Sequence, residues 1–160
     1  MKRILFLLAV FVLSAAVAGP MMAQDNPFVG TWKLNVAKSK FTGMPAPKEM
    51  TREIVAAGSG ATYTFTGTDA NGGAISYSFT SNYDGKDAAI TGSGVPGGAD
   101  AITIKRVGPS KAEGTLKKGG KEIAKVSAVV SKDGKTSTVT STGKSADGKS
   151  MSSVSVYDKQ

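Results

Sequence analysis

Residues 61–81, ATYTFTGTDANGGAISYSFTS, contain the pattern that decides the fold class of this chain. On either side of Asn71-Gly72-Gly73, aromatic and aliphatic residues alternate with Thr or Ser. This period of two indicates half-buried β-strands, because successive side chains of a strand point to opposite faces. Gly-Gly tolerates the backbone angles of a tight reversal. The stretch therefore predicts two antiparallel strands joined by a short turn.

The same alternation extends over most of the chain and predicts about ten short strands. Asp-Gly or Gly-Gly pairs, which favour tight hairpin turns, separate many of them. No stretch of ten or more residues carries a helical apolar stripe, although a turn or two of helix fits within residues 35–42. The segment 92–98, GSGVPGG, is interpreted as one long flexible connection. Beyond the hairpin, the predicted strands cover residues 31–36, 51–55, 87–91, 102–107, 111–118, 122–130, 136–142 and 151–157.

A sheet of this size in one small domain has to close or fold over, since long exposed edges promote aggregation. We therefore predict an all-β fold, an antiparallel up-and-down β-barrel of about eight to ten strands. A β-sandwich would need Greek-key crossovers, which the short connections argue against.

The composition fits a single domain and excludes several kinds of chemistry. The 160 residues include no Cys and no His, so disulfides, thiol nucleophiles, Cys/His zinc sites and histidine catalysis are excluded. The formal net charge is +8. The lysines are spread over many turns rather than clustered with aromatic residues, so we expect no nucleic-acid partner.

The N-terminus has the features of a signal peptide. Lys2 and Arg3 precede an apolar run from Ile4 to Val17, which is too short to span a bilayer comfortably. We predict a signal peptide at 1–23, cleaved after Ala18 or Ala23, and a single barrel domain at 24–160. That domain is expected to be periplasmic or secreted and to have no integral membrane span. Because the sequence has no Cys, a lipoprotein is excluded.

Three motif-like patterns do not indicate catalysis. Gly143, Gly148, Lys149 and Ser150 have P-loop spacing, but a strand rather than a helix is predicted to follow, so the pattern is interpreted as a hairpin turn. Ser141 and Lys144 have the spacing of some serine enzymes, which requires a helix. Asp69 and the other turn aspartates stabilise reversals. We therefore predict no enzyme activity, no metal and no cofactor.

The two ends of the predicted domain resemble the calycin group, which comprises lipocalins and fatty-acid-binding proteins, and the combined pattern resembles secreted bacterial proteins. The relevant stretches are residues 26–34, NPFVGTWKL, and 154–159, VSVYDK; Gly119-Gly120-Lys121-Glu122 also fits. The resemblance implies that Gly30 and Trp32 close the base of the barrel. It also implies that Tyr157 contacts a ligand, as the final-strand tyrosine of fatty-acid-binding proteins does.

The sequence departs from this group where a ligand carboxylate would bind. The two late-strand arginine positions correspond to Ser155 and Ser127, so a free fatty acid becomes a doubtful ligand. Only Arg52 and Arg106 remain in the predicted domain, and either could point inward. The two lid helices of the intracellular family are also missing.

Alternation leaves the phase of each strand open. If Tyr157 points inward, the candidate ligand-binding residues are Tyr157, Ser155, Ser127, Tyr63, Phe65, Tyr77 and Phe79. In the opposite phase Val154 and Val156 point inward, and the barrel is filled.

Two functions follow from these two phases. The first is a binding protein that holds a small hydrophobic or lipid-like ligand in the barrel. The second is an envelope or extracellular interaction protein with a filled barrel and a basic surface. The sequence leaves the oligomeric state open.

Overall fold

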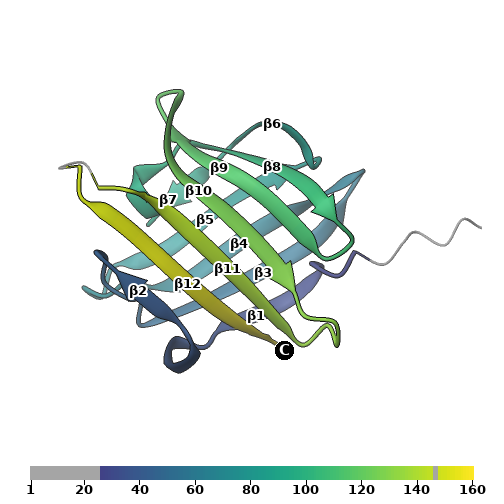
Figure 1. The fold of residues 1–160 in the computed structure, drawn as a ribbon, viewed down its shortest axis with the longest axis horizontal. Helices are drawn as coiled ribbons and strands as arrows, with labels where there is room; N and C mark the ends of the chain where they lie inside the picture. Colours follow the sequence, from purple (N-terminus) through teal and green to yellow (C-terminus); the bar gives the residue numbers. More distant parts are fainter. Residues whose placement is uncertain (1–25, 146–147) are drawn as a thin grey trace, which may run out of the picture.

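The protein is an all-β chain, and its computed structural model describes residues 26–145 and 148–160 (Figure 1). The predicted signal peptide at 1–23 lies outside these residues. Within them the helical elements are two short 3-10 turns, η1 (Val36–Lys38) and η2 (Pro96–Gly98). The strands are β1 (Gly30–Leu34), β2 (Lys40–Thr42), β3 (Glu49–Ala57), β4 (Gly60–Thr68), β5 (Ala74–Ser81), β6 (Asp84–Ala89), β7 (Thr91–Ser93), β8 (Ala101–Gly108), β9 (Lys111–Lys118), β10 (Lys121–Val130), β11 (Thr136–Lys144) and β12 (Ser150–Lys159).

The strands form one antiparallel sheet that curves into a nearly closed barrel. Strands β8 to β12 are neighbours in sequence order, β1 pairs with β12, and β3 to β5 follow on the other side of β1. β6 pairs with β8, and β7 pairs with β5. Because only Ile90 separates β6 from β7, these two short strands together fill the space between β5 and β8.

This arrangement confirms the up-and-down barrel expected from the short connections. The predicted number of about eight to ten strands was slightly low. Short β2 pairs with β12 beside the main path, and the predicted strand at 87–91 is divided between β6 and β7. The helical turn expected within 35–42 is η1, whose Lys38 backbone N–H donates to the Asn35 side chain at 3.1 Å.

The Asp133-Gly134 pair forms a predicted hairpin turn, whereas Asp84 and Gly85 begin β6, which pairs with β8 rather than with β5. In the β10–β11 turn the Asp133 carboxylate accepts a hydrogen bond from the Lys135 backbone N–H at 3.1 Å. Gly134 follows with φ = 71°, a left-handed conformation that glycine adopts without steric cost. The pattern with P-loop spacing falls on the β11–β12 connection, where β11 ends at Lys144 and β12 begins at Ser150. A strand follows the glycine, so the hairpin interpretation is confirmed.

The flexible connection predicted at 92–98 is more ordered than its glycine content suggested. Gly92 and Ser93 belong to β7, and Pro96–Gly98 forms η2. An added Cβ on Gly92 would collide with the carbonyl oxygen of Ser76 on β5. Glycine at this position therefore permits close approach of two backbones, a role that sequence cannot distinguish from loop flexibility.

The phase of the last strand is the one in which Tyr157 points inward. Ser153, Ser155 and Tyr157 are buried, whereas Val154 is 39% exposed. On β1 the inward residues are Trp32 and Leu34. β12 therefore directs small polar side chains into the barrel and a valine toward solvent, the reverse of what burial of apolar surface would favour for that strand alone.

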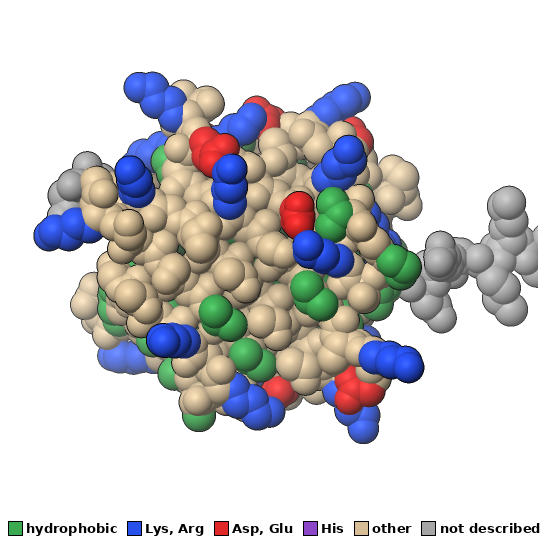
Figure 2. Space-filling view, in the orientation of Figure 1, with side chains coloured by type: hydrophobic (Ala, Val, Ile, Leu, Met, Phe, Trp, Pro, Cys, Tyr) green, Lys and Arg blue, Asp and Glu red, His purple; other side chains and the backbone are tan. Residues whose placement is uncertain are grey.

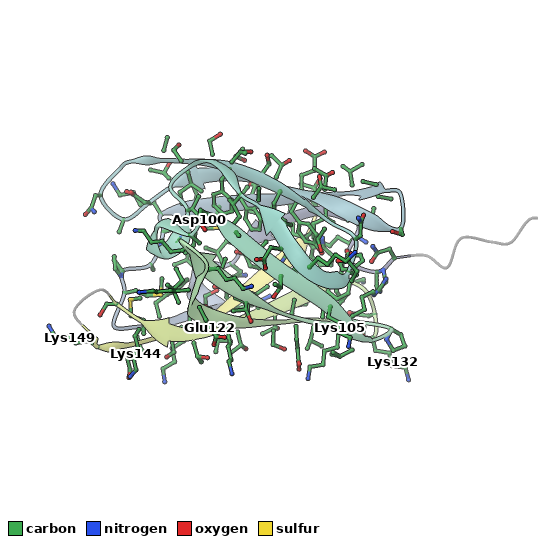
Figure 3. The ribbon with its side chains drawn as sticks, turned by 90° about the horizontal axis from the view of Figure 1, so that it is seen from above. Asp100, Lys105, Glu122, Lys132, Lys144 and Lys149 are labelled. Atoms are coloured by element: carbon green, nitrogen blue, oxygen red, sulfur yellow. The ribbon has the colours of Figure 1, made fainter. Side chains whose placement is uncertain are left out.

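Most charged side chains lie on the outside of the barrel, whereas Arg52 on β3 is buried. The face seen in Figure 2 carries lysines singly, with few hydrophobic side chains between them. Figure 3 shows Lys144 and Lys149 at one end of the barrel and Lys132 at the opposite end. We name the end with the β11–β12 turn the mouth and the end with the β10–β11 turn the base. No helix within 26–145 or 148–160 has the length and apolarity needed to cross a membrane.

Candidate functional site

The barrel encloses a cavity of about 190 Å³. A cavity of about 10–15 Å³ already holds one water molecule, so this space is large enough for an organic molecule. Most of the cavity surface comes from apolar and aromatic side chains, with a few polar groups at defined points. This combination is typical of small-molecule binding sites.

Four aromatic residues on β4 and β5 form one wall of the cavity. Tyr63 lies opposite Phe79 and Phe65 opposite Tyr77 in the strand register. The rings of Tyr63 and Phe79 stack with centroids 4.8 Å apart, and those of Phe65 and Tyr77 with centroids 4.5 Å apart. Such cross-strand aromatic pairs stabilise a sheet and hold its side chains in place. The structure thus brings together the four aromatic residues identified from sequence, and all of them line the cavity.

Small and polar residues on β11 and β12 form another part of the lining. Tyr157, Ser155 and Ser153 on β12 line the cavity, as do Ser141 and Val139 on β11. In the register Val139 lies opposite Ser155, and Ser141 lies opposite Ser153. Because these side chains are short, this wall leaves interior volume that larger residues would occupy.

The predicted inward orientation of Ser127 is wrong. Ser127 lies in a groove on the outer surface with Lys105, Thr140 and other residues, while its neighbours Val126 and Ala128 line the cavity. The pairing of β10 with β9 shifts between Glu122 and Ala124, which marks a β-bulge. A bulge adds one residue to a strand and reverses the face of every residue after it, so counting from Lys121-Glu122 selected the wrong face.

Arg52 on β3 points into the barrel, an orientation that the sequence alone leaves open. It lines the cavity and is only 4% exposed. Ile54, two residues later, is also buried, so both belong to the inward face of β3. The two-residue spacing of Arg52 and Ile54, which places both side chains on one face of a strand, can be read from the sequence. It was ambiguous because Val55 is also apolar and would have pointed inward in the opposite phase.

The guanidinium of Arg52 is held mainly by neutral groups. Its Nη2 donates to the Ser137 hydroxyl at 2.8 Å, and its carbon lies 4.5 Å from the Tyr157 ring centroid and 5.8 Å from that of Trp32. Its Nε is buried without a hydrogen-bond partner in the described part of the chain. No carboxylate within residues 26–145 or 148–160 forms an ion pair with it. Burial lowers the pKa of Arg52, and the neighbouring tyrosines act in the opposite direction.

Glu113 is the acidic residue among those that line the cavity. Its side chain is half exposed, and its carboxylate lies 2.7 Å from the ammonium of Lys111. In the register Glu113 is opposite Lys105 and Ser127, which places it on the outward face of β9. Glu113 therefore contributes to the cavity wall without offering its carboxylate to Arg52.

Trp32 and Gly30 lie at the base of the barrel. Trp32 is fully buried, and its indole N–H donates to the Phe28 carbonyl oxygen at 2.8 Å. The Lys159 ammonium lies 5.2 Å from the centroid of the indole ring. Gly30 has φ = 133°, and an added Cβ would lie 2.8 Å from the Lys159 side chain. Phe28 and Arg52, rather than Trp32, form the surface of the cavity at this end.

A hydrogen-bonded group of side chains also closes the base. The hydroxyls of Tyr63 and Tyr83 lie 2.8 Å apart, and the Asn26 amide donates to Tyr83 at 3.3 Å. Arg106 contacts the rings of Phe28 and Tyr83 and donates to the Pro109 carbonyl oxygen at 2.6 Å. Arg106 is therefore used at the base, and Arg52 is the arginine that reaches the cavity.

The mouth end is lined by apolar residues from two connections. Met44 and Pro47 come from the segment between β2 and β3, and Val95 and Pro96 come from the segment between β7 and β8. Phe41 on β2 completes this group. Short irregular segments therefore occupy the end of the barrel where the resemblance to fatty-acid-binding proteins would have implied two helices.

The buried tyrosines give a prediction about alkaline pH. Burial raises the pKa of Tyr63, Tyr77 and Tyr157, while the charge of Arg52 acts in the opposite direction. Above about pH 10 the unfolded chain loses phenolic protons that the folded chain retains. The stabilisation that these tyrosines provide is therefore complete below about pH 10. Above that pH the free energy of unfolding falls, by up to about 1.4 kcal/mol per pH unit for each tyrosine.

Urea unfolding at pH 8, 10 and 11, together with absorbance at 295 nm, would measure this dependence. We expect ionisation of the buried tyrosines to coincide with unfolding, and Tyr157→Phe to reduce the slope. Ordinary tyrosine titration near pH 10 without loss of stability would contradict the prediction.

Comparisons with known proteins point to one fold. No protein-family model matches the chain, and no curated protein matches it. Among solved structures, the chain is similar to zebrafish ileal bile acid-binding protein complexed with cholic acid, with a TM-score of 0.51 and 19% sequence identity. The match covers 84% of this chain and 99% of the zebrafish protein. At that identity the likeness concerns the fold: the chain is an antiparallel, nearly closed up-and-down barrel that resembles the fatty-acid-binding and bile-acid-binding proteins.

Proposed function

We propose that this protein binds a small hydrophobic or lipid-like molecule inside its barrel and acts as a binding protein without enzymatic activity. The observation that carries the proposal is the cavity of about 190 Å³, with its aromatic wall on β4 and β5 and its short side chains on β11 and β12. Burying an apolar ligand against such a surface contributes about 25 cal/mol for each Å² removed from water. The similar zebrafish barrel, which is complexed with cholic acid, supports the proposal by analogy of fold.

The orientation of β12 favours this function over the alternative of a filled barrel. A filled barrel would need Val154 and its apolar neighbours inside, whereas Ser153 and Ser155 occupy the inward positions. An interaction protein that works through its basic surface has no clustered lysine patch to support it on the face seen in Figure 2. Ligand storage or transport is therefore the function that the geometry supports better.

We also propose that the protein acts outside the cytoplasm, after cleavage of the signal peptide at 1–23. The basic start and the apolar run that follows support this part of the proposal. N-terminal sequencing of protein isolated from the cell envelope or medium is expected to begin at Gly19 or Gln24. Protein from either fraction that still begins at residue 1 would refute cleavage of the signal peptide.

Native mass spectrometry of gently purified protein tests the binding function directly. We expect a stoichiometric adduct that dissociates on denaturation and whose mass identifies a hydrophobic small molecule. A mass equal to the chain alone, together with no binding of the neutral fluorescent probe N-phenyl-1-naphthylamine, would overturn the proposal.

A cavity-filling substitution gives a sharper test. Ser155→Leu places a larger apolar side chain inside the barrel, so we expect it to weaken binding of N-phenyl-1-naphthylamine by at least about 10-fold through loss of volume. Val154→Leu, one residue away on the outward face, is the matched control and should change affinity by less than about 2-fold. Equal effects of the two variants would indicate that the probe binds outside the cavity.

A further inference from the structure

We propose that the ligand carries a single anionic group, a carboxylate or sulfonate, and that Arg52 binds this group at the base of the cavity. The inference rests on the proposed binding function and specifies the chemical class of its ligand. Arg52 combines a buried charge with contacts to Ser137, Tyr157 and Trp32, and its Nε–H has no acceptor among the described residues.

Arg52 carries a positive charge into the interior of the barrel. Arginine stays protonated in proteins, so Arg52 cannot become neutral to escape the cost of burial. A buried cation normally has a carboxylate partner, because an unpaired charge in an apolar interior is strongly unfavourable. Around Arg52 the described residues supply a serine hydroxyl and aromatic rings instead. An anionic ligand group would supply the missing opposite charge.

The neighbours of Arg52 hold its guanidinium in a defined position. The Tyr157 ring lies 4.5 Å from the guanidinium carbon and the Trp32 ring 5.8 Å from it. Aromatic rings contact the face of a guanidinium, whereas its hydrogen bonds leave from the edge of the plane. The Ser137 hydroxyl takes one edge position through Nη2, and Nε has no acceptor among the described residues. The edge therefore keeps the Nε–H donor for an anionic acceptor, and edge donors are the groups through which arginine binds carboxylates.

Other polar groups along the cavity can also contact an anionic ligand. The Tyr157 hydroxyl donates to the sulfur of Met50 at 3.3 Å, and sulfur is a weak acceptor. That hydroxyl can therefore turn to a stronger acceptor at little cost. Ser153 and Ser155 are buried on the same face of β12 and also line the cavity. The remaining lining is mainly apolar, so the ligand is an amphipathic monoanion with its charge at the base and its apolar body toward the mouth.

Two fluorescent probes that differ by one sulfonate group test the inference. 1-Anilinonaphthalene-8-sulfonate carries a sulfonate that N-phenyl-1-naphthylamine lacks. We expect Arg52→Met to weaken binding of the sulfonate probe by about 10- to 100-fold, as for loss of a charge-assisted hydrogen bond, and to change binding of the neutral probe by less than about 3-fold. Arg106→Met, which removes the arginine used at the base, is the matched control and should leave both affinities within about 3-fold.

The outcomes separate this inference from the proposed function. If the wild type binds neither probe, the binding function itself fails. If it binds both and Arg52→Met affects them equally, Arg52 is a structural residue and the anionic ligand is refuted.

Preference for the sulfonate probe should persist at 0.5 M KCl, because a buried charge is screened less than surface lysines. Loss of the preference in salt would assign it to the surface and overturn the inference.

A measurement on the wild-type chain keeps the test independent of variants that fail to fold. The predicted mature domain contains two arginines, Arg52 and Arg106, so its arginine Nε–H groups give two NMR resonances. The sulfonate probe is expected to shift one of them strongly, while the neutral probe shifts it much less. Equal shifts with the two probes, or no shift, would contradict direct contact between Arg52 and the anion.

Discussion

Trp32→Ala is expected to lower the free energy of unfolding by about 3–5 kcal/mol. Trp32 is fully buried at the base, beneath Arg52 and next to Phe28. Its removal loses the largest buried side chain and leaves a cavity among residues of β1, β3 and β12, which the closed barrel cannot collapse to fill. It also leaves the carbonyl oxygen of Phe28 without the indole donor.

Urea denaturation followed by circular dichroism would measure this loss, because the variant lacks the single tryptophan as a fluorophore. Trp32→Phe separates the two contributions, since it retains an aromatic ring but not the 2.8 Å hydrogen bond, and it is expected to cost roughly 1–3 kcal/mol. Val154→Ala, at an exposed position of β12, is the control and should cost less than about 1 kcal/mol. A cost for Trp32→Ala no greater than that of Val154→Ala would contradict the role of Trp32 in the core.

Gly60→Ala is expected to cost about 3 kcal/mol, an unusually large effect for the addition of one methyl group. Gly60 begins β4, and an added Cβ would collide with the carbonyl oxygen of Ser81 and lie 2.6 Å from the Cα of Asn82. Both obstacles are backbone atoms at the end of β5, so no side-chain rotation relieves the clash. The substitution must displace β4 from β5 near the pair Ala61 and Ser81.

Gly108→Ala is the matched control, because the nearest atom to its added Cβ is the Lys111 Cβ at an ordinary 3.8 Å. We expect this change to be neutral or to stabilise the protein slightly, by reducing the freedom of the unfolded chain. Tryptophan fluorescence during urea unfolding would report both variants. Equal midpoints for the two would show that β4 and β5 tolerate the extra atom, and the argument from close backbone approach would fail.

The location of the strands and turns could be predicted because each depends on local chemistry. Thr-aromatic alternation on β4 and β5 and the Asp133-Gly134 turn are local preferences that hold in any sheet. Two local interpretations were wrong for physical reasons. Gly92 belongs to a strand because another backbone lies close to it, and Ser127 faces outward because a bulge between Glu122 and Ala124 reverses the phase of β10. Both features depend on the neighbouring strand, which the sequence of one strand does not contain.

The candidate site was predictable only in part for the same reason. The four aromatic residues of β4 and β5, together with Tyr157 and Ser155, were identified from alternation and from the resemblance at the two chain ends, and all six line the cavity. The role of Arg52 depends on Ser137, Trp32 and Tyr157, which come from strands distant in sequence. No spacing rule within β3 could have assembled that group.

The sequence by itself determined the period of each strand, the type of most turns and the all-β class, because pleating and backbone angles are properties of a few consecutive residues. The tertiary structure alone decided which phase of each strand faces inward. Closure of the barrel joins β1 to β12 and β3, so the phases must agree all the way around. That agreement placed serines inside and Val154 outside, opened the cavity, and buried Arg52 within it.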